Sequence, residues 1–348
     1  MKNRLGDYIQ EISLRNKSDE QIPVYSVTNT HGFCKDYFGK EVASKDKKTY
    51  KIVPKGCFAY NPSRINVGSV DWQRLEERVI VSPLYNVFSV SERIRQQYLY
   101  YYLKSDFVLQ RIRCVATGSV RDNLKIEMLK EFPITIPTLP EQDRIVKILD
   151  DAKRVIDLRK KELDALDKLI KARFIEMFGD PISNSKKLVT KDLKDVFVLK
   201  AGDFTAASDI SDKPTETKIY PCYGGNGIRG YVDEYNQEGA YSLIGRQGAL
   251  SGNVQYAYGK FKNTEHALLV TPKIEMNSIW LNQLLVNLDL KRYQTGAAQP
   301  GLSVKNLQDI QVISVPIELQ NQFADFVAQV DKSKFALCRY NVMEYKCE

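Results

Sequence analysis

The fold is decided by two similar stretches, 117-TGSVRDNLKIEMLKEFPITIPTLPEQDRIVKILDDAKRVIDL-158 and 295-TGAAQPGLSVKNLQDIQVISVPIELQNQFADFVAQVDKSKFAL-337. At an offset of 178 residues, Leu124 aligns with Leu302 and Gln142 with Gln320. This offset is close to half of the 348 residues, so the sequence predicts two copies of one unit. Each unit is expected to be a mixed, strand-rich module followed by a long helix. The predicted fold class is α+β with a pseudo-twofold internal repeat.

The upstream parts of the two copies are less alike. Residues 57–70, CFAYNPSRINVGSV, align with residues 240–254, AYSLIGRQGALSGNV, and this alignment places Arg64 opposite Arg246. Both segments alternate short apolar runs with Gly, Asn and Ser, which is typical of strands joined by polar turns. Similar helices attached to divergent modules indicate a shared scaffold that carries two different recognition surfaces.

A long helix is predicted over residues 138–178. Thr138 and Glu141 have the spacing of a capping box, and Gly179 and Pro181 are expected to end the helix. Apolar residues recur in steps of four and three, interrupted by two arginines, which predicts a coiled-coil seam. The seam residues are Ile145, Leu149, Ala152, Ile156, Leu163, Leu166, Ile170 and Met177.

The second copy offers a partner for this helix. The same spacing continues after residue 317, without a capping box and over about ten fewer residues, with seam residues Phe323, Phe326, Val330 and Leu337. We therefore expect an intramolecular antiparallel coiled coil between residues 140–180 and 317–348. Two alternatives stay open at this point: a helix packed on one globular core, and pairing between chains.

Composition and charge narrow the function classes. The chain is 43% hydrophobic and 27% charged, which is ordinary for a globular protein. It has no apolar run of about 18 residues and no apolar signal segment at its N-terminus, so we expect a cytoplasmic protein without a membrane partner. The net charge is +8, and residues 1–139 carry +7 of it. This balance fits either a polyanion partner or a slightly basic protein of another kind.

Residue types that support catalysis or metal binding are sparse. The six cysteines include no CxxC pair, and His31 and Cys34 form one isolated pair, so no metal site is expected. No P-loop and no convincing Ser/His/Asp set occur. Residues 223–227, YGGNG, loosely match the cofactor loop of methyltransferases, but a strand-like segment follows them where a helix should begin. We expect no catalytic residue in this chain.

The repeated motifs resemble those of the specificity (S) subunits of type I DNA restriction-modification enzymes. The motifs that carry the resemblance are 137-PTLPEQ-142, 178-FGDP-181, 296-GAAQPGLS-303 and 317-IELQNQF-323. Each motif is short, but their order and their duplication span essentially the whole chain. The final helix ends earlier than in many members of the family, which predicts a shorter coiled coil or a truncated variant.

The resemblance implies an organisation in four parts. Residues 1–139 and 181–316 correspond to two target recognition domains that each read half of a split, asymmetric sequence in double-stranded DNA. Residues 140–180 and 317–348 correspond to two conserved helical spacers. These spacers set the gap between the half-sites and dock two methyltransferase (M) subunits, and restriction (R) subunits complete the complex.

The resemblance also implies that the chain itself is not an enzyme and binds no cofactor. The methyltransferase uses S-adenosylmethionine to modify adenine N6, and the motor-nuclease subunit uses ATP and Mg. Two other functions are kept as hypotheses: a specificity subunit whose partner is a fused methyltransferase-nuclease, and a coiled-coil scaffold that binds no DNA. A third hypothesis, a degenerate methyltransferase, would require S-adenosylmethionine binding by the isolated chain.

Candidate DNA-contacting residues lie in the polar turns, because Arg, Asn, Gln and Ser on loops can hydrogen bond to base edges. These candidates are Asn61, Ser63, Arg64, Asn66, Arg121 and Asn123 in the first module, and Arg246, Gln247, Ser251, Asn253 and Gln299 in the second. For each of them, a role in stabilising a turn is an alternative of similar weight.

Overall fold

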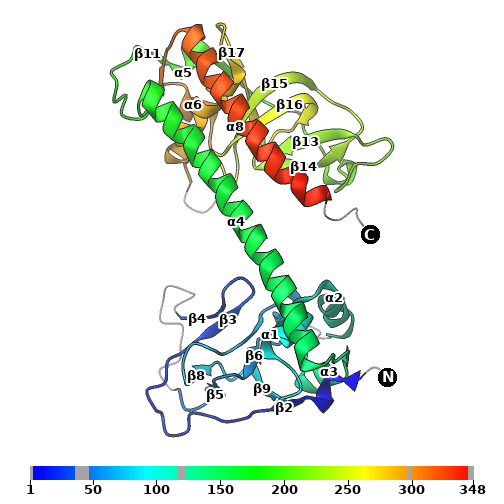
Figure 1. Cartoon of the computed structure of the whole chain (residues 1–348). Coiled ribbons are helices and arrows are strands. Elements are labelled where there is room, and N and C mark those ends of the chain that lie inside the picture. The colour runs from blue at the N-terminus through cyan, green and yellow to red at the C-terminus, as the bar shows by residue number, and fades with distance from the viewer. Residues whose placement is uncertain (1–2, 36–46, 117–122, 297–299, 344–348) are drawn as a thin grey trace. The chain divides into compact units, whose positions relative to one another are not determined.

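The computed structural model describes residues 3–35, 47–116, 123–296 and 300–343, with side chains up to residue 337 in the last helix. The chain divides into two compact units, Met1–Ile156 and Asp157–Glu348. The long helix α4 (Leu139–Phe178) contributes its first part to unit 1 and its last part to unit 2 (Figure 1).

Unit 1 is built on a four-stranded antiparallel sheet in the order β2-β9-β6-β7, accompanied by three two-stranded sheets, β1-β10, β3-β4 and β5-β8. Its strands are β1 (Asn3–Arg4), β2 (Ile9–Glu11), β3 (Ser26–Thr28), β4 (Gly32–Cys34), β5 (Lys51–Pro54), β6 (Phe58–Tyr60), β7 (Val70–Trp72), β8 (Arg78–Val81), β9 (Asn86–Val90) and β10 (Pro133–Ile134). Its shorter helices are α1 (Gln96–Lys104), α2 (Asp106–Val115) and α3 (Ile126–Lys130), with 3-10 turns η1 (Leu5–Asp7) and η2 (Ile65–Val67).

Aromatic residues on the central strands hold the core of unit 1 together. Phe58 of β6 stacks on Phe88 of β9 with ring centroids 5.2 Å apart, and both side chains are fully buried. Such pairs add to the stabilisation that comes from burying their large apolar area. The hydroxyl of buried Tyr60 donates to the carbonyl of Leu124, which ties the sheet to the segment before α3.

Unit 2 contains a six-stranded sheet in the order β12-β17-β15-β16-β13-β14, in which β13 and β16 are parallel, and a two-stranded sheet β11-β18. Its strands are β11 (Thr190–Asp192), β12 (Phe197–Ala201), β13 (Tyr220–Gly224), β14 (Gly227–Val232), β15 (Gln237–Gly245), β16 (Val254–Asn263), β17 (Ala267–Pro272) and β18 (Gln311–Ile313). Its helices are α5 (Leu193–Val196), α6 (Ser278–Asn287), α7 (Val304–Leu307) and α8 (Ile317–Met343), with 3-10 turns η3 (Ala207–Asp209) and η4 (Leu290–Tyr293).

The predicted internal repeat is confirmed in the order of the elements. The sheet β2-β9-β6-β7 of unit 1 has its counterpart in β12-β17-β15-β16 of unit 2, and β1-β10 corresponds to β11-β18. In each unit the strand β9 or β17 leads into a helix, α1 or α6, and the short helix α3 or α7 precedes the last strand and the long helix. Unit 2 adds the hairpin β13-β14 at one edge of its sheet.

The first predicted helix is present with almost the expected bounds. The Glu141 carboxylate accepts hydrogen bonds from the Thr138 backbone N–H, at 2.9 Å, and from the Thr138 hydroxyl, at 2.7 Å. The hydrogen bond from the Thr138 backbone N–H is the half of the predicted capping box that the carboxylate makes. The Thr138 hydroxyl donates to the same carboxylate, whereas in a full capping box it would accept from a backbone N–H. The helix ends at Gly179, whose φ of +77° favours glycine.

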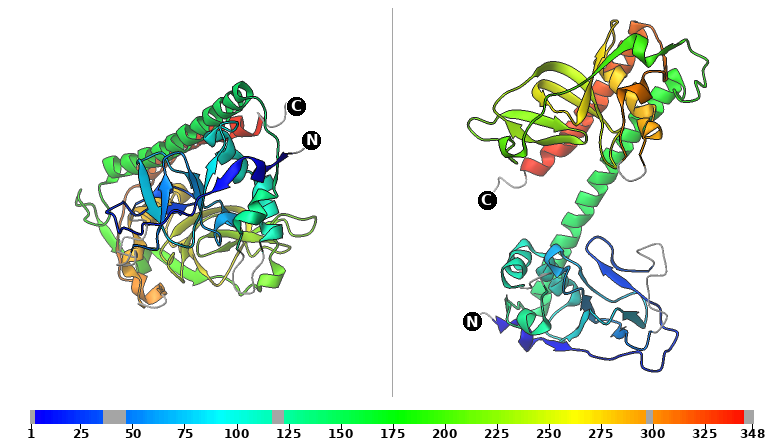
Figure 2. Two further views of the ribbon diagram at one scale, coloured as in Figure 1. Left: turned by 90° about the horizontal axis from the view of Figure 1, so that it is seen from below. Right: turned by 180° about the vertical axis from the view of Figure 1, so that it is seen from behind.

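The antiparallel pairing of the two long helices is confirmed within unit 2. Phe174 of α4 contacts Phe323 of α8, at a centroid distance of 5.5 Å, and Asp167 pairs with Lys334 at 2.6 Å. The residue numbers fall along α4 as they rise along α8, and the views of Figures 1 and 2 agree that the helices lie side by side. Trp280 of α6 also packs against Phe174, so the pair belongs to the core of unit 2.

Some of the predicted seam residues are buried in the core of unit 2, and others are not. Ile170, Phe323 and Val330 are buried between the helices, and Leu166, Met177 and Phe326 are partly buried against the same core. Fully buried Phe174 and Phe178 each lie one residue beyond a heptad position, which falls at Arg173, one of the two interrupting arginines, and at Met177. The displacement of one residue arises because a straight helix has 3.6 residues per turn, whereas the heptad assumes 3.5.

The part of the predicted seam that lies in unit 1 is exposed. Leu149 and Ile156 are 38% and 48% exposed, Ala152 is exposed and Ile145 is half-buried. Leu163 and Leu337 in unit 2 are half-buried. The apolar pattern of α4 therefore continues through a stretch that is largely exposed.

Candidate nucleic-acid interface

The loop between β6 and β7 of unit 1 holds four of the candidate residues. The Asn61 side-chain oxygen accepts hydrogen bonds from the backbone N–H and the hydroxyl of Ser63, at 3.1 and 3.0 Å. Asn61 and Ser63 thus form a local turn, which is the stabilising role expected of such residues. Arg64 is exposed and makes no side-chain hydrogen bond or ion pair with any residue that the structure describes, and Asn66 is half-buried.

A polar cavity of about 180 Å³ opens beside this loop. Arg64 and Asn61 line it together with Thr28, Asn29 and Tyr85, so hydrogen-bond donors and acceptors surround it. Burial raises the pKa of the Tyr85 phenol, although hydrogen bonds with Val27 and Asn61 and, to a smaller extent, the charge of Arg64 oppose this effect. The cavity offers the mixture of donors and acceptors that base edges require.

A cationic side chain fixes one wall of this cavity. Lys104 of α1 donates from Nζ to the carbonyl of Asn29 at 2.7 Å. Desolvation lowers the pKa of Lys104, although Asp71 opposes this effect. The β3-β4 hairpin that carries Asn29 is thereby held against α1.

The second segment of unit 1 that holds candidate residues, around Asn123, lies beside the loop between β6 and β7. Asn123 is exposed, and the next residue, Leu124, donates from its backbone N–H to the carbonyl of Pro62 at 3.1 Å. The structure therefore brings Asn123 next to the loop of Asn61 and Arg64. Arg121 lies outside the described residues.

The corresponding loop of unit 2 is more tightly built. Arg246 is half-buried and donates from Nη1 to the Glu265 carbonyl at 3.2 Å, while its buried Nε has no partner among the described residues. Gln247 is exposed, and its side-chain oxygen lies 2.9 Å from Nδ1 of His266. The other ring nitrogen of His266 lies 3.0 Å from the Glu265 carboxylate, so Gln247 belongs to a polar chain on the surface.

Of the remaining candidates of unit 2, Asn253 makes a hydrogen bond that stabilises the loops. Ser251 is fully buried, so its side chain is not available to a ligand in this conformation. Asn253 is half-buried and donates to the side-chain oxygen of Asn226 in the β13-β14 turn, at 2.7 Å. Gly248 donates to the carbonyl of Pro300, which joins this loop to the segment that precedes α7. Gln299 lies outside the described residues.

The two loops correspond, but with a different alignment from the one expected. Leu124 and Leu302 occupy equivalent places; the first donates its backbone N–H to Pro62, and the second to Arg246. Arg246 therefore takes the place of Pro62, and the expected equivalence of Arg64 with Arg246 is wrong. The sequence alignment failed because the loops differ in length, and only the hydrogen bonds fix their relative register.

Sequence reasoning missed His266 and Asn226 at this edge of unit 2. A lone histidine gives no motif in the sequence, and its link to Gln247 spans 19 residues. The YGGNG segment forms the turn between β13 and β14 and the adjoining strand ends, as the strand-like residues after it suggested. Within the described part of the chain, no group of three or more His, Cys, Asp or Glu residues could hold a metal ion.

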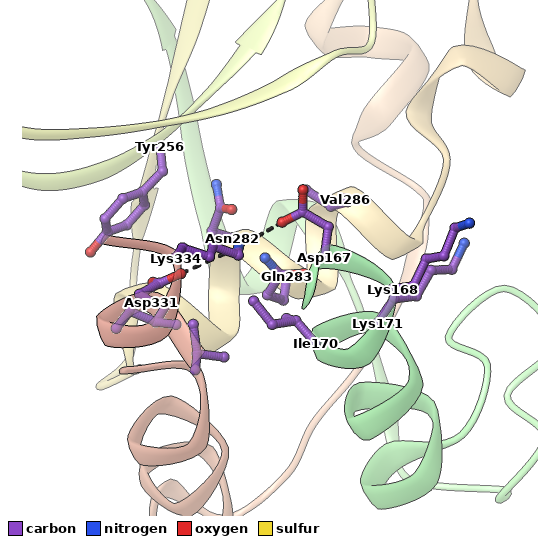
Figure 3. A pocket seen from close by; sticks show the side chains of 12 residues that line it. Asp167, Lys168, Ile170, Lys171, Tyr256, Asn282, Gln283, Val286, Asp331 and Lys334 are labelled. Carbon is purple, nitrogen blue, oxygen red and sulfur yellow. Dashed lines mark hydrogen bonds and ion pairs between the residues drawn. The ribbon is translucent and has the colours of Figure 1, made fainter. Parts of the chain in front are cut away.

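A separate groove of about 470 Å³ lies in unit 2 between α4, α6, α8 and β16. Figure 3 shows Lys334 between Asp167 and Asp331, with ion pairs of 2.6 and 3.3 Å. Partial burial lowers the pKa of Lys334, but the two carboxylates outweigh this effect and raise it overall. The charge of Lys334 is thus balanced by two carboxylates of the protein itself. The groove lies where the long helices meet the rest of unit 2.

Two apolar surfaces lie on the long helices. The first, which we call the α4 stripe, is formed in unit 1 by Ile145, Ile148, Leu149, Ala152, Val155 and Ile156, of which Ile148 is 57% and Val155 47% exposed. The second, the α4-α8 groove of unit 2, has a volume of about 620 Å³ and is lined by Arg159, Glu162, Ala165, Leu166, Leu169, Ser333, Ala336 and Leu337. Contiguous exposed apolar surface of this kind marks protein interaction sites.

The described helices include none with the length and apolar character of a membrane span.

Comparisons with known proteins agree on one family. A family model described as "Type I restriction modification DNA specificity domain" matches residues 8–168 and 185–341. The chain is 32% identical over 270 residues to the type I restriction enzyme EcoprrI specificity subunit of Escherichia coli, a match that covers 72% of this chain and 65% of that subunit. It is 28% identical over 131 residues to the type I restriction enzyme MjaIX specificity subunit of Methanocaldococcus jannaschii, covering 36% of this chain and 30% of that subunit.

The fold has a counterpart among solved structures. The S subunit of a type I restriction-modification system from M. genitalium superposes with a TM-score of 0.55 at 17% sequence identity. The superposition covers 98% of this chain and 91% of that chain. The two proteins therefore share one fold.

Proposed function

Because the chain belongs to the family of type I restriction-modification DNA specificity domains, we propose that it is the specificity subunit of a restriction-modification complex and reads a bipartite, asymmetric DNA target. The observation that carries this proposal is the duplication itself. Four strands lie in the same order in both units, and a long helix follows each module. The loops after β6 and β15, in contrast, differ in length, side chains and hydrogen bonds. One scaffold with two different loops suits the reading of two different half-sites.

We propose that the two units read DNA with unequal sets of side chains. In unit 1, Arg64, Asn66 and Asn123 are the candidates with no described role in holding the loop, and Arg64 can bond a guanine through two nitrogens. In unit 2, exposed Gln247 is the corresponding candidate, supported by His266. Asn61, Ser63, Arg246 and Asn253 keep these loops in shape, and Ser251 is buried.

The chain would supply the address, and its partners the chemistry. Two methyltransferase subunits would dock on the α4 stripe and on the α4-α8 groove, which are the large apolar surfaces of the helices in units 1 and 2. In this proposal, S-adenosylmethionine is bound by the methyltransferase, and ATP and Mg by the restriction subunits. Because adenine N6 is the target atom, the base would leave the helical stack and enter the methyltransferase.

Binding to duplex DNA at several salt concentrations tests the proposal against the scaffold hypothesis. We expect the chain in complex with its genomically adjacent methyltransferase to lose affinity steeply as salt rises, because each neutralised phosphate releases counterions. The methyltransferase alone is the matched control and should discriminate poorly between sequences. If the complex forms but binds DNA no better than the methyltransferase alone, the chain is a scaffold.

A further inference from the structure

The first turn of each long helix carries a glutamine whose side chain is almost completely inaccessible. Gln142 of α4 is 0% exposed and Gln320 of α8 is 3% exposed. In unit 1, Gln142 Oε1 accepts from the Arg95 backbone N–H at 2.8 Å. Its Nε2 donates to the carbonyls of Arg93 and Pro137, both at 2.9 Å. One side chain thus bonds the segment before α1 and the segment before α4.

Unit 2 repeats this arrangement at the equivalent place. Gln320 Oε1 accepts from the Asn277 backbone N–H at 2.9 Å, and its Nε2 donates to the Val315 carbonyl at 2.9 Å. Arg95 and Asn277 are the N-cap residues of α1 and α6. Each glutamine therefore anchors the start of a module helix to the start of a long helix.

The residue after each glutamine contacts the side chain of the same N-cap residue. Asp143 forms a two-point ion pair with Arg95, with Nε–Oδ1 at 2.9 Å and Nη2–Oδ2 at 3.0 Å. Asn321 accepts from the Asn277 side-chain amide at 2.9 Å. The positions agree between the units but the chemistry differs: an ion pair in unit 1 and an amide pair in unit 2.

We propose that Gln142–Asp143 and Gln320–Asn321 are positioning residues that fix the direction of each long helix relative to its own recognition module. Apolar packing alone tolerates sliding and tilting because it is not directional, whereas buried hydrogen bonds to backbone groups have strict distances and angles. The glutamine supplies the rigid part of the joint. The exposed pairs, Arg95–Asp143 and Asn277–Asn321, contribute less to the free energy of unfolding, since exposed polar and ionic pairs are weak. Their role is to match each module to its own helix.

The consequence for DNA rests on the proposed function. If each module is held at a fixed angle on its helix, the two half-sites must be separated by one fixed gap. A loosened joint would allow the module to reach half-sites that are displaced by one base pair. The spacer helices would set the length of the gap, the joint would keep this gap single, and the loops would set the sequence of each half-site.

The first test replaces Gln142 by leucine in the full chain, co-expressed with the adjacent methyltransferase. We expect the amide hydrogen of Arg95 to exchange about tenfold faster, because it loses its acceptor. We also expect methylated motifs with a gap one base pair longer or shorter, with both half-site sequences unchanged. Gln320→Leu should have the same effects, with Asn277 as the amide, and Gln322→Leu, at an exposed position of the same helix, should have none.

The second test reverses the charges of the ion pair. Arg95→Asp and Asp143→Arg should each broaden the gap, since each places like charges together, and the double variant should restore a single gap. Both residues are exposed, so these variants avoid a cavity in the core. If the ion pair only stabilised the module, the double variant would not restore a single gap.

The outcomes separate this proposal from the proposed function. Unchanged amide exchange in Gln142→Leu overturns the joint, whatever the DNA result. Faster exchange with an unchanged single gap overturns its role in setting the gap. If the wild-type chain produces no bipartite motif at all, the proposed function fails, and the exchange measurement then decides alone whether the joint fixes the module on its helix.

Discussion

At the scale of single residues, Arg64 and Arg246 have different roles. Arg64 is exposed and unpaired within the described chain, so we expect Arg64→Ala to leave the free energy of unfolding unchanged. Binding to the cognate site should weaken by about ten- to a hundredfold, the discrimination that one two-point base contact provides. Titration of the purified complex with cognate and random duplexes measures both losses.

Arg78→Ala is the matched control, because Arg78 is a half-exposed arginine of unit 1 that pairs with Glu20. Arg78→Ala should not weaken binding to the cognate duplex more than binding to the random duplex. If Arg64→Ala lowers the affinity for cognate and random DNA equally, Arg64 contacts a phosphate and not a base. Arg246→Ala should instead act through its loop, because Arg246 donates to the Glu265 carbonyl.

At the scale of elements, the aromatic cluster between α4, α6 and α8 holds unit 2 together. Phe174 is fully buried against Phe178, Trp280 and Phe323. We expect Phe174→Ala to cost about 3–5 kcal/mol of unfolding free energy, through lost burial and the cavity left behind. Urea denaturation measures this loss. Phe204→Ala, at a position that is 79% exposed, should change the stability little, and similar losses for both variants would contradict the packing described here.

The α4 stripe gives a prediction for partner binding. Ile148 and Ile156 are exposed, so replacing both by glutamine should leave the unfolding free energy of the chain nearly unchanged. Binding of the methyltransferase should weaken by about tenfold or more, because apolar anchors dominate interfaces. The pair Lys147→Gln and Arg154→Gln, on the same turns but off the stripe, is the control. A loss of the same size in the control would exclude the stripe as the docking surface.

The elements were predictable from the sequence to different degrees. The bounds of α4 followed from a strong period, a carboxylate at the third position and a terminal glycine, all of which act locally. The burial of Ser251 and the docking of Arg246 depend on segments far along the chain, such as Glu265 and Pro300, which no local pattern reveals. The buried faces of Phe174 and Phe178 were missed because the heptad spacing drifts from the true helical repeat.

At the scale of the whole molecule, each unit should specify its own half-site. Exchange of residues 1–139 for the corresponding module of a related subunit, with Arg95 and Asp143 kept as a pair, should change one half of the methylated motif. The other half and the gap should stay the same, because the loops and the joint of unit 2 are untouched and the Arg95–Asp143 pair of the first joint is kept. Sequencing of methylated DNA from both strains makes the comparison. Changes in both halves would contradict independent reading.

If this chain gives a methyltransferase a two-part address, methylation of a whole genome will reveal both parts. The chain is co-expressed with its genomically adjacent methyltransferase in a host free of adenine methylation, and N6-methyladenine is mapped across that genome. We expect one asymmetric motif with two defined half-sites and a single gap, which disappears when the chain is omitted. A soluble complex that leaves the genome unmethylated, or that methylates a continuous motif, would contradict it.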